Sequence, residues 1–388
     1  MGREAPKARA NTGAAAQAAR QVPGGWKWLD IGVNVWLTFG GLVLLALFVW
    51  WAKFNLDAYY TRVLNMSAIY VVAAVSYNLI NGVAGQFSLG PNGFMSVGAY
   101  ATALLMLPVS QKEMVWFLQP LVWPLNSFSL PGWLFVVGLI AAGIVGTIGG
   151  LIVGIPSLRL RGDYLAIATF GFGEIVFVIA NNIIPVTNGA LGIKGIPEFT
   201  DLWWTAGWAV FTVIVVQNLV NSSFGRALKA IREDETAAEA MGVNVFMHKV
   251  LAFGISAFFG GVAGGLLAGL LSSMMPSVFT FFMTFNLLII IVLGGLGSTT
   301  GAVVTAILFT ILQEYLRVVE APIDIAFIHI PGIPGMRMVV VSALLVILMI
   351  FWRKGLFGRN EFSWEWLLTR FGLKRGDDKW QNTAMKGS

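Results

Sequence analysis

The hydrophobic pattern of this chain consists of long apolar runs separated by short polar segments. No run shows the two-residue alternation of a membrane-spanning strand, so each one predicts a helix. Most of the runs approach the roughly 20 residues that a transmembrane helix needs. They fall at about 31–52, 63–80, 88–107, 133–155, 164–184, 202–221, 249–272, 284–297, 301–318 and 336–352. The pattern predicts an all-α polytopic membrane protein.

The stretch 284–318 has two interpretations, because Gly294, Gly295 and Gly297 interrupt it. It is either one kinked helix or two short helices joined by a tight turn. The tails 1–28 and 355–388 are rich in Lys and Arg, and the positive-inside rule places both in the cytoplasm. That placement requires an even number of crossings. We therefore predict two helices here, about ten spans in all, some short or broken, and a transmembrane domain over 29–354.

Composition agrees with a membrane protein and excludes several kinds of chemistry. Hydrophobic residues make up 57% of the 388 residues and charged residues only 11%, against about 25% in soluble domains. The 45 glycines suit close packing of transmembrane helices. There is no cysteine and there are two histidines, so we expect no disulfide and no metal site. The net charge of +6 reports loop orientation and does not indicate a nucleic-acid partner.

Residues 81–93 interrupt the apolar pattern at the start of the third span with glycine, proline and amide side chains. Non-helical backbone at membrane depth is tolerated where it is buried in protein or lines a cavity, and in transporters such breaks mark substrate paths. The alternative is an ordinary cytoplasmic loop. Gln86 and Ser88 are the candidate path residues of this break. The glycine-rich break at 294–301 has the same two interpretations.

Glu174 lies about ten residues into the span that begins at Tyr164, which places it about 15 Å deep at helical rise. An acid at that depth needs a partner or water. It belongs either to the translocation path or to a structural hydrogen bond between helices. Asn181 and Asn182 follow at the outer end of the span, where they are candidates to hand substrate inward or to cap the helix.

The segment 222–247 is the charged, helix-forming island of the chain. Ser222 or Ser223 is positioned to cap a helix, and Gly242 is placed where that helix ends. Leu228, Ile231, Ala238 and Met241 recur at helical spacing and are predicted to share one face. The charges of the island are Arg226, Lys229, Arg232, Glu233, Asp234, Glu235 and Glu239. Four acids against three bases favour a protein partner over an anionic membrane surface.

Residues 225–244 resemble the cytoplasmic coupling loop of branched-chain amino acid ATP-binding-cassette (ABC) importers, and specifically their LivM-type membrane permease subunit. The resemblance runs from about Arg159 to Phe357. It includes Arg159-Leu-Arg-Gly-Asp-Tyr, Gly171-Phe-Gly-Glu-Ile, Thr187-Asn-Gly, Val292-Leu-Gly-Gly-Leu-Gly-Ser and Arg337-Met-Val-Val.

The resemblance implies a multi-pass inner-membrane protein that pairs with a second permease, two cytoplasmic ATPases and a periplasmic binding protein. It also implies that the island docks on an ATPase, so that aspartate at Ile231 and Met241 is expected to release the ATPases. The chain has no Gly-Lys dipeptide and hence no phosphate-binding loop of the GxxxxGK type. It is therefore expected not to be an enzyme and to bind no cofactor, with ATP and Mg²⁺ used by its partners. A stand-alone carrier or channel, or a permease for urea, amides or other amino acids, are the alternatives.

Overall fold

The computed structural model describes residues 27–159, 164–320, 323–325, 328–330, 335–351, 355–358 and 361. It divides into two compact units, residues 1–51 with 363–388 and residues 52–362. Helix α2 (Lys27–Asn55) supplies the described part of the first unit, and every later element lies in the second. Most of the two predicted tails lies outside the described residues.

The second unit is built almost entirely from helices. Its helices are α3 (Ala58–Asn78), η1 (Leu79–Val83), α4 (Pro91–Met106), α5 (Val109–Val115), η2 (Gly132–Leu134), α6 (Phe135–Ser157), α7 (Tyr164–Asn182), α8 (Ile184–Thr187), η3 (Gly189–Leu191), α9 (Leu202–Asn221), α10 (Ser223–Glu233), α11 (Glu235–Ala240), α12 (Val245–Leu271), η4 (Pro276–Phe279), α13 (Phe281–Gly294), α14 (Thr299–Tyr315), η5 (Leu316–Glu320) and α15 (Met336–Phe351). The strands of the described residues form two short antiparallel pairs, β1 (Ile193–Lys194) with β2 (Ser273–Met274) and β3 (Ile323–Ile325) with β4 (Ile328–Ile330). The predicted all-α class is therefore confirmed.

Each apolar run of the sequence coincides with a helix, and 284–318 forms the two helices α13 and α14. Among the described residues, seven helices are long and apolar enough to cross a membrane, or eight if the bent pair α4–α5 is one span. The last of the seven joins η4 to α13 over Pro276–Gly294, 19 residues. Helices α14 and α15 have 17 and 16 residues and are shorter than each of these spans. The count of ten crossings and the cytoplasmic position of both termini stay predictions.

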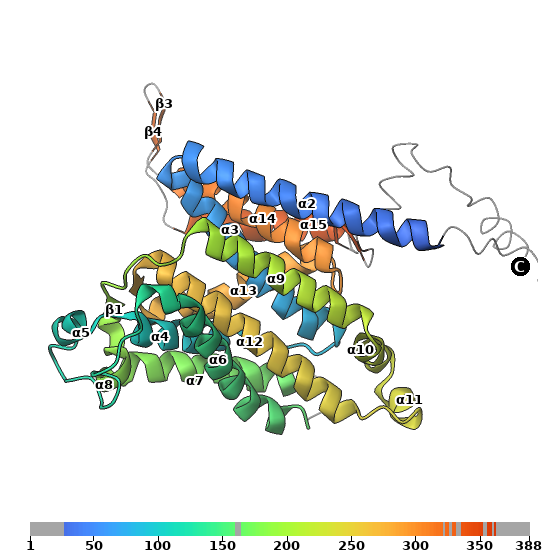
Figure 1. The fold of residues 1–388 in the computed structure, drawn as a ribbon, viewed down its shortest axis with the longest axis horizontal. Coiled ribbons are helices and arrows are strands. Elements are labelled where there is room, and N and C mark those ends of the chain that lie inside the picture. The colour runs from blue at the N-terminus through green and yellow to red at the C-terminus, as the bar shows by residue number, and fades with distance from the viewer. Residues whose placement is uncertain are drawn as a thin grey trace, which may run out of the picture. The chain divides into compact units, whose positions relative to one another are not determined.

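Helix α12 forms the centre of the second unit. It packs against α6, α4 and α3 (Figure 1). In its most apolar stretch, 78% of the residues are buried. Glycines permit this close approach, because a Cβ on Gly264 would lie 1.9 Å from the Met95 carbonyl oxygen and one on Gly98 would lie 2.2 Å from that of Gly261. The abundance of glycine in the sequence thus serves helix packing, as in other membrane bundles.

A segment that includes α5 folds back at the end of α4, with a bend of 119° between the two helices. Lys112 on α5 is buried, and its Nζ donates hydrogen bonds to the carbonyl oxygens of Leu125, at 2.7 Å, and Phe128. The indole N–H of Trp116 donates to the Ile184 carbonyl at 3.1 Å. These bonds hold the segment that follows α5 against α5 itself and join Trp116 to α8.

Candidate coupling site

The charged segment 222–247 forms two short helices between α9 and α12 (Figure 1). Helix α10 follows Ser222, whose Oγ accepts a hydrogen bond from the Gly225 N–H at 3.3 Å. Helix α11 follows Asp234, whose Oδ1 accepts from the N–H groups of Thr236 at 2.8 Å and Ala237 at 3.0 Å. The sequence predicted one helix. The structure breaks it at Asp234, because this residue is extended and caps a new helix.

The apolar residues of the two helices pack into the chain's own core. Leu228, Ile231 and Ala238 are 0%, 2% and 4% exposed, whereas Met241 is 84% exposed. The four residues were expected to share one face, but the break at Asp234 and the turn after α11 separate Met241 from the others. The three buried residues hold the segment on the bundle, and of the four Met241 alone is available to a partner.

The outward side of the segment is charged and mainly acidic. Its exposed charged residues are Arg226, Glu233, Asp234, Glu235 and Glu239, and Lys229 is partly exposed. Glu235 forms an ion pair with Lys249 of α12. The turn that follows α11 exposes Met241 and Gly242, and Gly242 adopts φ +83°, a conformation that favours glycine. Four exposed acids therefore stand against one exposed base, Arg226, a more acidic balance than the four to three of the sequence.

Arg232 is turned inward, toward the helix breaks. Its side chain is 19% exposed, its Nη1 donates to the Gly82 carbonyl oxygen at 2.8 Å, and its Nη2 contacts Glu233 Oε1 at 2.9 Å. A Cβ on Gly85 would lie 2.4 Å from Arg232 Cγ, and one on Gly297 would lie 3.0 Å from Arg232 Nη1. Arg232 thus joins α10 to both glycine-containing interruptions.

The first interruption, predicted at 81–93, is a π-helical turn, η1, followed by non-helical backbone up to the start of α4. Gln86 is 5% exposed and Ser88 is fully buried. The backbone of Ser88 is held by the Tyr77 hydroxyl, which donates to its carbonyl at 2.6 Å, and by Asn81 Oδ1, which accepts from its N–H at 3.1 Å. Gln86 and Ser88 are thus enclosed by protein, whereas Gly85 and Phe87 beside them are exposed, so a substrate path at this break stays a prediction.

The second interruption, between α13 and α14, packs directly on the first. Gly295 and Gly297 adopt φ values of +109° and +91°. The Asn78 side chain bonds this turn twice, since its Nδ2 donates to the Ser298 carbonyl at 3.1 Å and its Oδ1 accepts from the Gly297 N–H at 3.0 Å. A Cβ on Gly82 would lie 2.3 Å from the Gly297 nitrogen, so glycine at position 82 is a steric requirement. We call the contact of η1, the 295–298 turn and Arg232 the joint.

The segment that follows α15 also reaches the joint. The N–H groups of Leu356 and Phe357 donate to the carbonyls of Leu293 and Gly294 at 2.8 and 3.2 Å. The Glu361 carboxylate accepts from the Thr299 N–H at 2.7 Å, and from the N–H and hydroxyl of Thr300 at 3.2 and 2.8 Å. Glu361 therefore caps α14, where the positive end of the helix dipole favours an anion.

The candidate path residues of α7 lie apart from the joint. Glu174 is partly exposed and has no hydrogen-bond or ion-pair partner among the described residues. The side-chain amides of Asn181 and Asn182 donate to the Phe177 and Val178 carbonyls of their own helix, at 2.9 and 2.7 Å. The buried face of α7 contains Gly173, Val176 and Ala180, so Glu174 belongs to the opposite, outward side.

The structure thus brings together features that the sequence presented separately. The charged segment and the two interruptions meet at one joint, whereas Glu174, Asn181 and Asn182 are located elsewhere on α7. Sequence reasoning missed Asn78 and Glu361. A polar residue inside an apolar run was a usable signal for Asn78. The sequence around Glu361 gave no signal of its capping role, because its hydrogen-bond partners lie 61 and 62 residues earlier in the chain.

Apolar helices of spanning length, two buried helix breaks and a charged segment joined to both define a polytopic membrane permease. Residues 59–351 match the family described as "Branched-chain amino acid transport system / permease component", and the chain belongs to this family. The prediction of a multi-pass inner-membrane protein is thereby confirmed.

Curated relatives have names that agree with the family. The chain is 30% identical over 310 residues, 71% of its length and 68% of theirs, to two proteins named "High-affinity branched-chain amino acid transport system permease protein LivM", from Salmonella typhimurium and Escherichia coli. It is 24% identical over 232 residues, 57% of its length and 67% of the relative's, to "Probable branched-chain amino acid transport permease protein LivM" of Methanocaldococcus jannaschii.

Proposed function

We propose that this chain is a permease subunit of an ABC importer and forms, with a second permease, the path for leucine, isoleucine and valine. Family membership and the printed names of the relatives support the substrate class. The observation that carries the mechanism is the inward contact of Arg232, which links the charged segment to the joint in the membrane domain.

We propose further that α10 and α11 dock on one of two cytoplasmic ATPase subunits. Leu228 and Ile231 anchor α10 to the bundle, so a force on its outer side is transmitted to the whole domain. The exposed acids and Met241 form the contact surface, and the ATPase groove complementary to them is basic around an apolar centre. ATP and Mg²⁺ are bound by these partners, and a periplasmic binding protein delivers the substrate.

Alternating access follows from this arrangement. Closure of the ATPase pair moves α10, and Arg232 passes the movement to Gly82 and to the turn at Gly297. A break in a helix bends at lower cost than a continuous helix, so the joint is the natural hinge. Glu174, Asn181 and Asn182 line the path or meet the second permease on the outward side of α7. Gln86 and Ser88 support the hinge from inside.

The topology proposed from charge has structural support. Residues 355–358 and Glu361 lie against the same joint as α10. The C-terminal tail therefore begins at the end of the bundle that carries the docking segment, which agrees with a cytoplasmic C-terminus.

Reconstituted transport tests the proposal against its alternatives. The complete complex, with ATPases and binding protein, is placed in vesicles, and uptake of radiolabelled leucine is measured with and without ATP. Uptake that depends on ATP and on the ATPases is expected. Uptake by this chain alone without ATP would instead establish a carrier or channel. If urea or acetamide competes for uptake and isoleucine and valine do not, the substrates are urea or amides in place of branched-chain amino acids. The assignment as a permease would still hold.

A further inference from the structure

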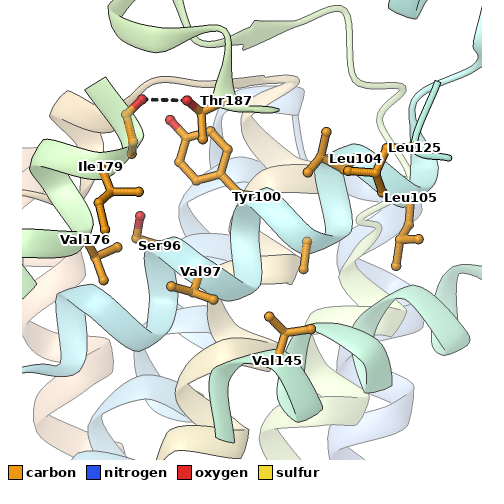
Figure 2. Close-up of a pocket in the computed structure, with 12 residues that line it drawn as sticks. Ser96, Val97, Tyr100, Leu104, Leu105, Leu125, Val145, Val176, Ile179 and Thr187 are labelled. Atoms are coloured by element: carbon orange, nitrogen blue, oxygen red, sulfur yellow. Dashed lines mark hydrogen bonds between the residues drawn. The ribbon is translucent and has the colours of Figure 1, made fainter. Parts of the chain in front are cut away.

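A pocket of about 340 Å³ lies between α4, α6 and α7, and none of its lining residues belongs to the joint. Its volume is at the lower end of the range of about 300–1,000 Å³ that small-molecule sites occupy. Figure 2 shows Ser96 and Tyr100 of α4 beside Val176 and Ile179 of α7, with Val145 of α6 on another side. Thr187 and Leu125 also line the pocket.

Two hydroxyl groups of the pocket lack partners within the described residues. Ser96 is 1% and Tyr100 is 6% exposed, and neither Ser96 Oγ nor Tyr100 Oη has a hydrogen bond. Thr187 differs, because its hydroxyl donates to the Ala180 carbonyl at 2.7 Å (Figure 2). Ser96 and Tyr100 are four residues apart and so lie on one face of α4. Buried hydroxyls without partners favour a ligand that brings hydrogen-bond acceptors.

The mouth of the pocket is apolar and opens sideways from the helices. Val145 is 38% and Ile179 is 46% exposed, and both belong to helices that are apolar enough to span a membrane. Such surfaces meet hydrocarbon. Leu125 and Thr187 lie in segments that connect spans, so the pocket extends from the hydrocarbon layer toward its boundary.

Among the described residues, no charged side chain lines the pocket. The transported amino acid is a zwitterion, and neither of its charges would find a partner here. Glu174 precedes Val176 by two residues, which is about 200° around the helix, and so lies on another side of α7. The ligand must therefore be uncharged where it is enclosed.

We propose that this pocket binds one acyl chain of a membrane phospholipid. The chain enters between Val145 and Ile179, and an ester carbonyl oxygen accepts a hydrogen bond from the Tyr100 hydroxyl, with Ser96 as the second donor. Phospholipid fits each observation. Its chain is apolar, its ester oxygens are neutral acceptors, and those oxygens lie at the boundary of the hydrocarbon layer, which the pocket reaches. The bound chain fills the space between α4, α6 and α7 and steadies their packing.

Photolabelling of the intact importer complex tests this site. The complex is reconstituted in phosphatidylethanolamine and phosphatidylglycerol vesicles that contain a phosphatidylcholine with a diazirine on one acyl chain. After illumination, the labelled peptides are mapped by mass spectrometry. We expect labelling of the α4 segment around Val97–Leu105 above that of other lipid-facing helices.

Three variants of the full complex define the pocket. Ala101→Phe places a ring in the lining and is expected to abolish the labelling of α4. Ile152→Phe, on the exposed side of α6 outside the pocket, is the matched control and is expected to change nothing. Tyr100→Phe preserves the shape and is expected to lower the labelling by about threefold, the loss for one neutral hydrogen bond.

Several results would overturn the proposal. Equal labelling of α4 in the Ala101→Phe variant would place the lipid elsewhere. Displacement of the label by excess leucine would make the occupant the transported substrate. Labelling of the isolated chain but not of the complex would show that the second permease covers the mouth. Because Tyr100→Phe removes a single oxygen, a folded variant with unchanged labelling would exclude the proposed hydrogen bond.

Discussion

Arg232 of α10 donates a hydrogen bond from Nη1 to the Gly82 carbonyl oxygen, 2.8 Å away, although 150 residues separate the two in sequence. The bond connects a charged helix at the end of the bundle to a π-helical turn within a spanning helix. The same turn packs on Gly297, which Asn78 holds in place. One arginine therefore links the docking segment to both helix breaks.

Replacing Arg232 with lysine should uncouple leucine transport from ATP hydrolysis while the complex stays assembled. Lysine retains the charge but lacks the planar fork that lets one side chain contact Gly82 and Glu233 together. Loss of a charge-assisted hydrogen bond to the joint is expected to lower ATP-driven leucine uptake by about tenfold. The ATPases should co-purify at the wild-type ratio, because Arg232 faces inward.

Arg226→Lys is the matched control for this change. Arg226 is exposed on the same helix and bonds only the nearby Asn221 carbonyl among the described residues. It should leave the coupling of ATP hydrolysis to uptake unchanged. Full uptake by the Arg232→Lys complex would show that the joint does not transmit movement.

Met241→Asp and Ile231→Asp should have different effects, although both were expected from the sequence to release the ATPases. Met241 is 84% exposed, so a charge there alters the contact surface and should lower ATPase co-purification while the thermal midpoint of the permease stays constant. Ile231 is 2% exposed, and an unpaired buried carboxylate should cost on the order of 4 kcal/mol of folding stability.

Ile231→Leu separates packing from docking, because a volume-conserving change costs less than about 1.5 kcal/mol and should preserve assembly. Pull-down of the ATPases and thermal unfolding of the detergent-solubilised permease are measured on the same preparations. Wild-type ATPase recovery with Met241→Asp would remove that residue from the docking surface.

Gly82→Ala should strain the joint. The new Cβ would lie 2.3 Å from the Gly297 nitrogen and 2.2 Å from Asn78 Oδ1, and the backbone contact cannot yield by side-chain rotation. Overpacking of this kind costs about 1–3 kcal/mol. Gly171→Ala on α7 is the control, since nothing lies within 4 Å of its Cβ position. Thermal midpoints and leucine uptake should both fall for Gly82→Ala and stay near wild type for Gly171→Ala.

Glu361→Ala should destabilise the N-terminal turn of α14. Its carboxylate accepts hydrogen bonds from Thr299 and Thr300, and loss of a capping side chain costs about 0.5–2 kcal/mol. Hydrogen exchange of the peptide containing Thr299 and Thr300 should accelerate, while exchange at α6 stays constant. Glu361→Gln retains an acceptor and should have an intermediate effect. Equal exchange in all three proteins would show that Glu361 does not cap α14 in the membrane.

The sequence predicted the membrane-spanning helices because each of them requires a long apolar run. It also located both interruptions, because a cluster of glycines is visible in a few consecutive residues. It did not predict how these parts meet. The sequence of the charged segment predicted one helix whose apolar face contacts a partner. In the structure, Leu228 and Ile231 of that face pack on the chain's own core. Spacing shows that residues share a face but not what that face touches. The contacts Arg232–Gly82 and Asn78–Gly297 join residues 150 and 219 positions apart, and only tertiary structure reveals them.

Glu174→Gln should impair transport more than assembly. Glu174 is partly exposed on the outward side of α7, and it has no hydrogen-bond or ion-pair partner in the part of the chain that the structure describes. An acid in a spanning helix is costly without a partner or water, so its place is on the path or against the second permease. Removing the charge while preserving the shape should lower the maximal rate of leucine uptake and leave recovery of both partner subunits unchanged.

Asn182→Asp changes the charge at a second candidate path residue of α7, which is exposed about two turns further along, near the end of the helix. It should alter uptake less than Glu174→Gln, because position 182 lies near the end of the span, where water is accessible. Uptake and subunit recovery are measured on the same vesicles. Loss of the second permease from the Glu174→Gln complex, with transport of the remaining intact complexes normal, would assign Glu174 to the subunit interface and remove it from the path.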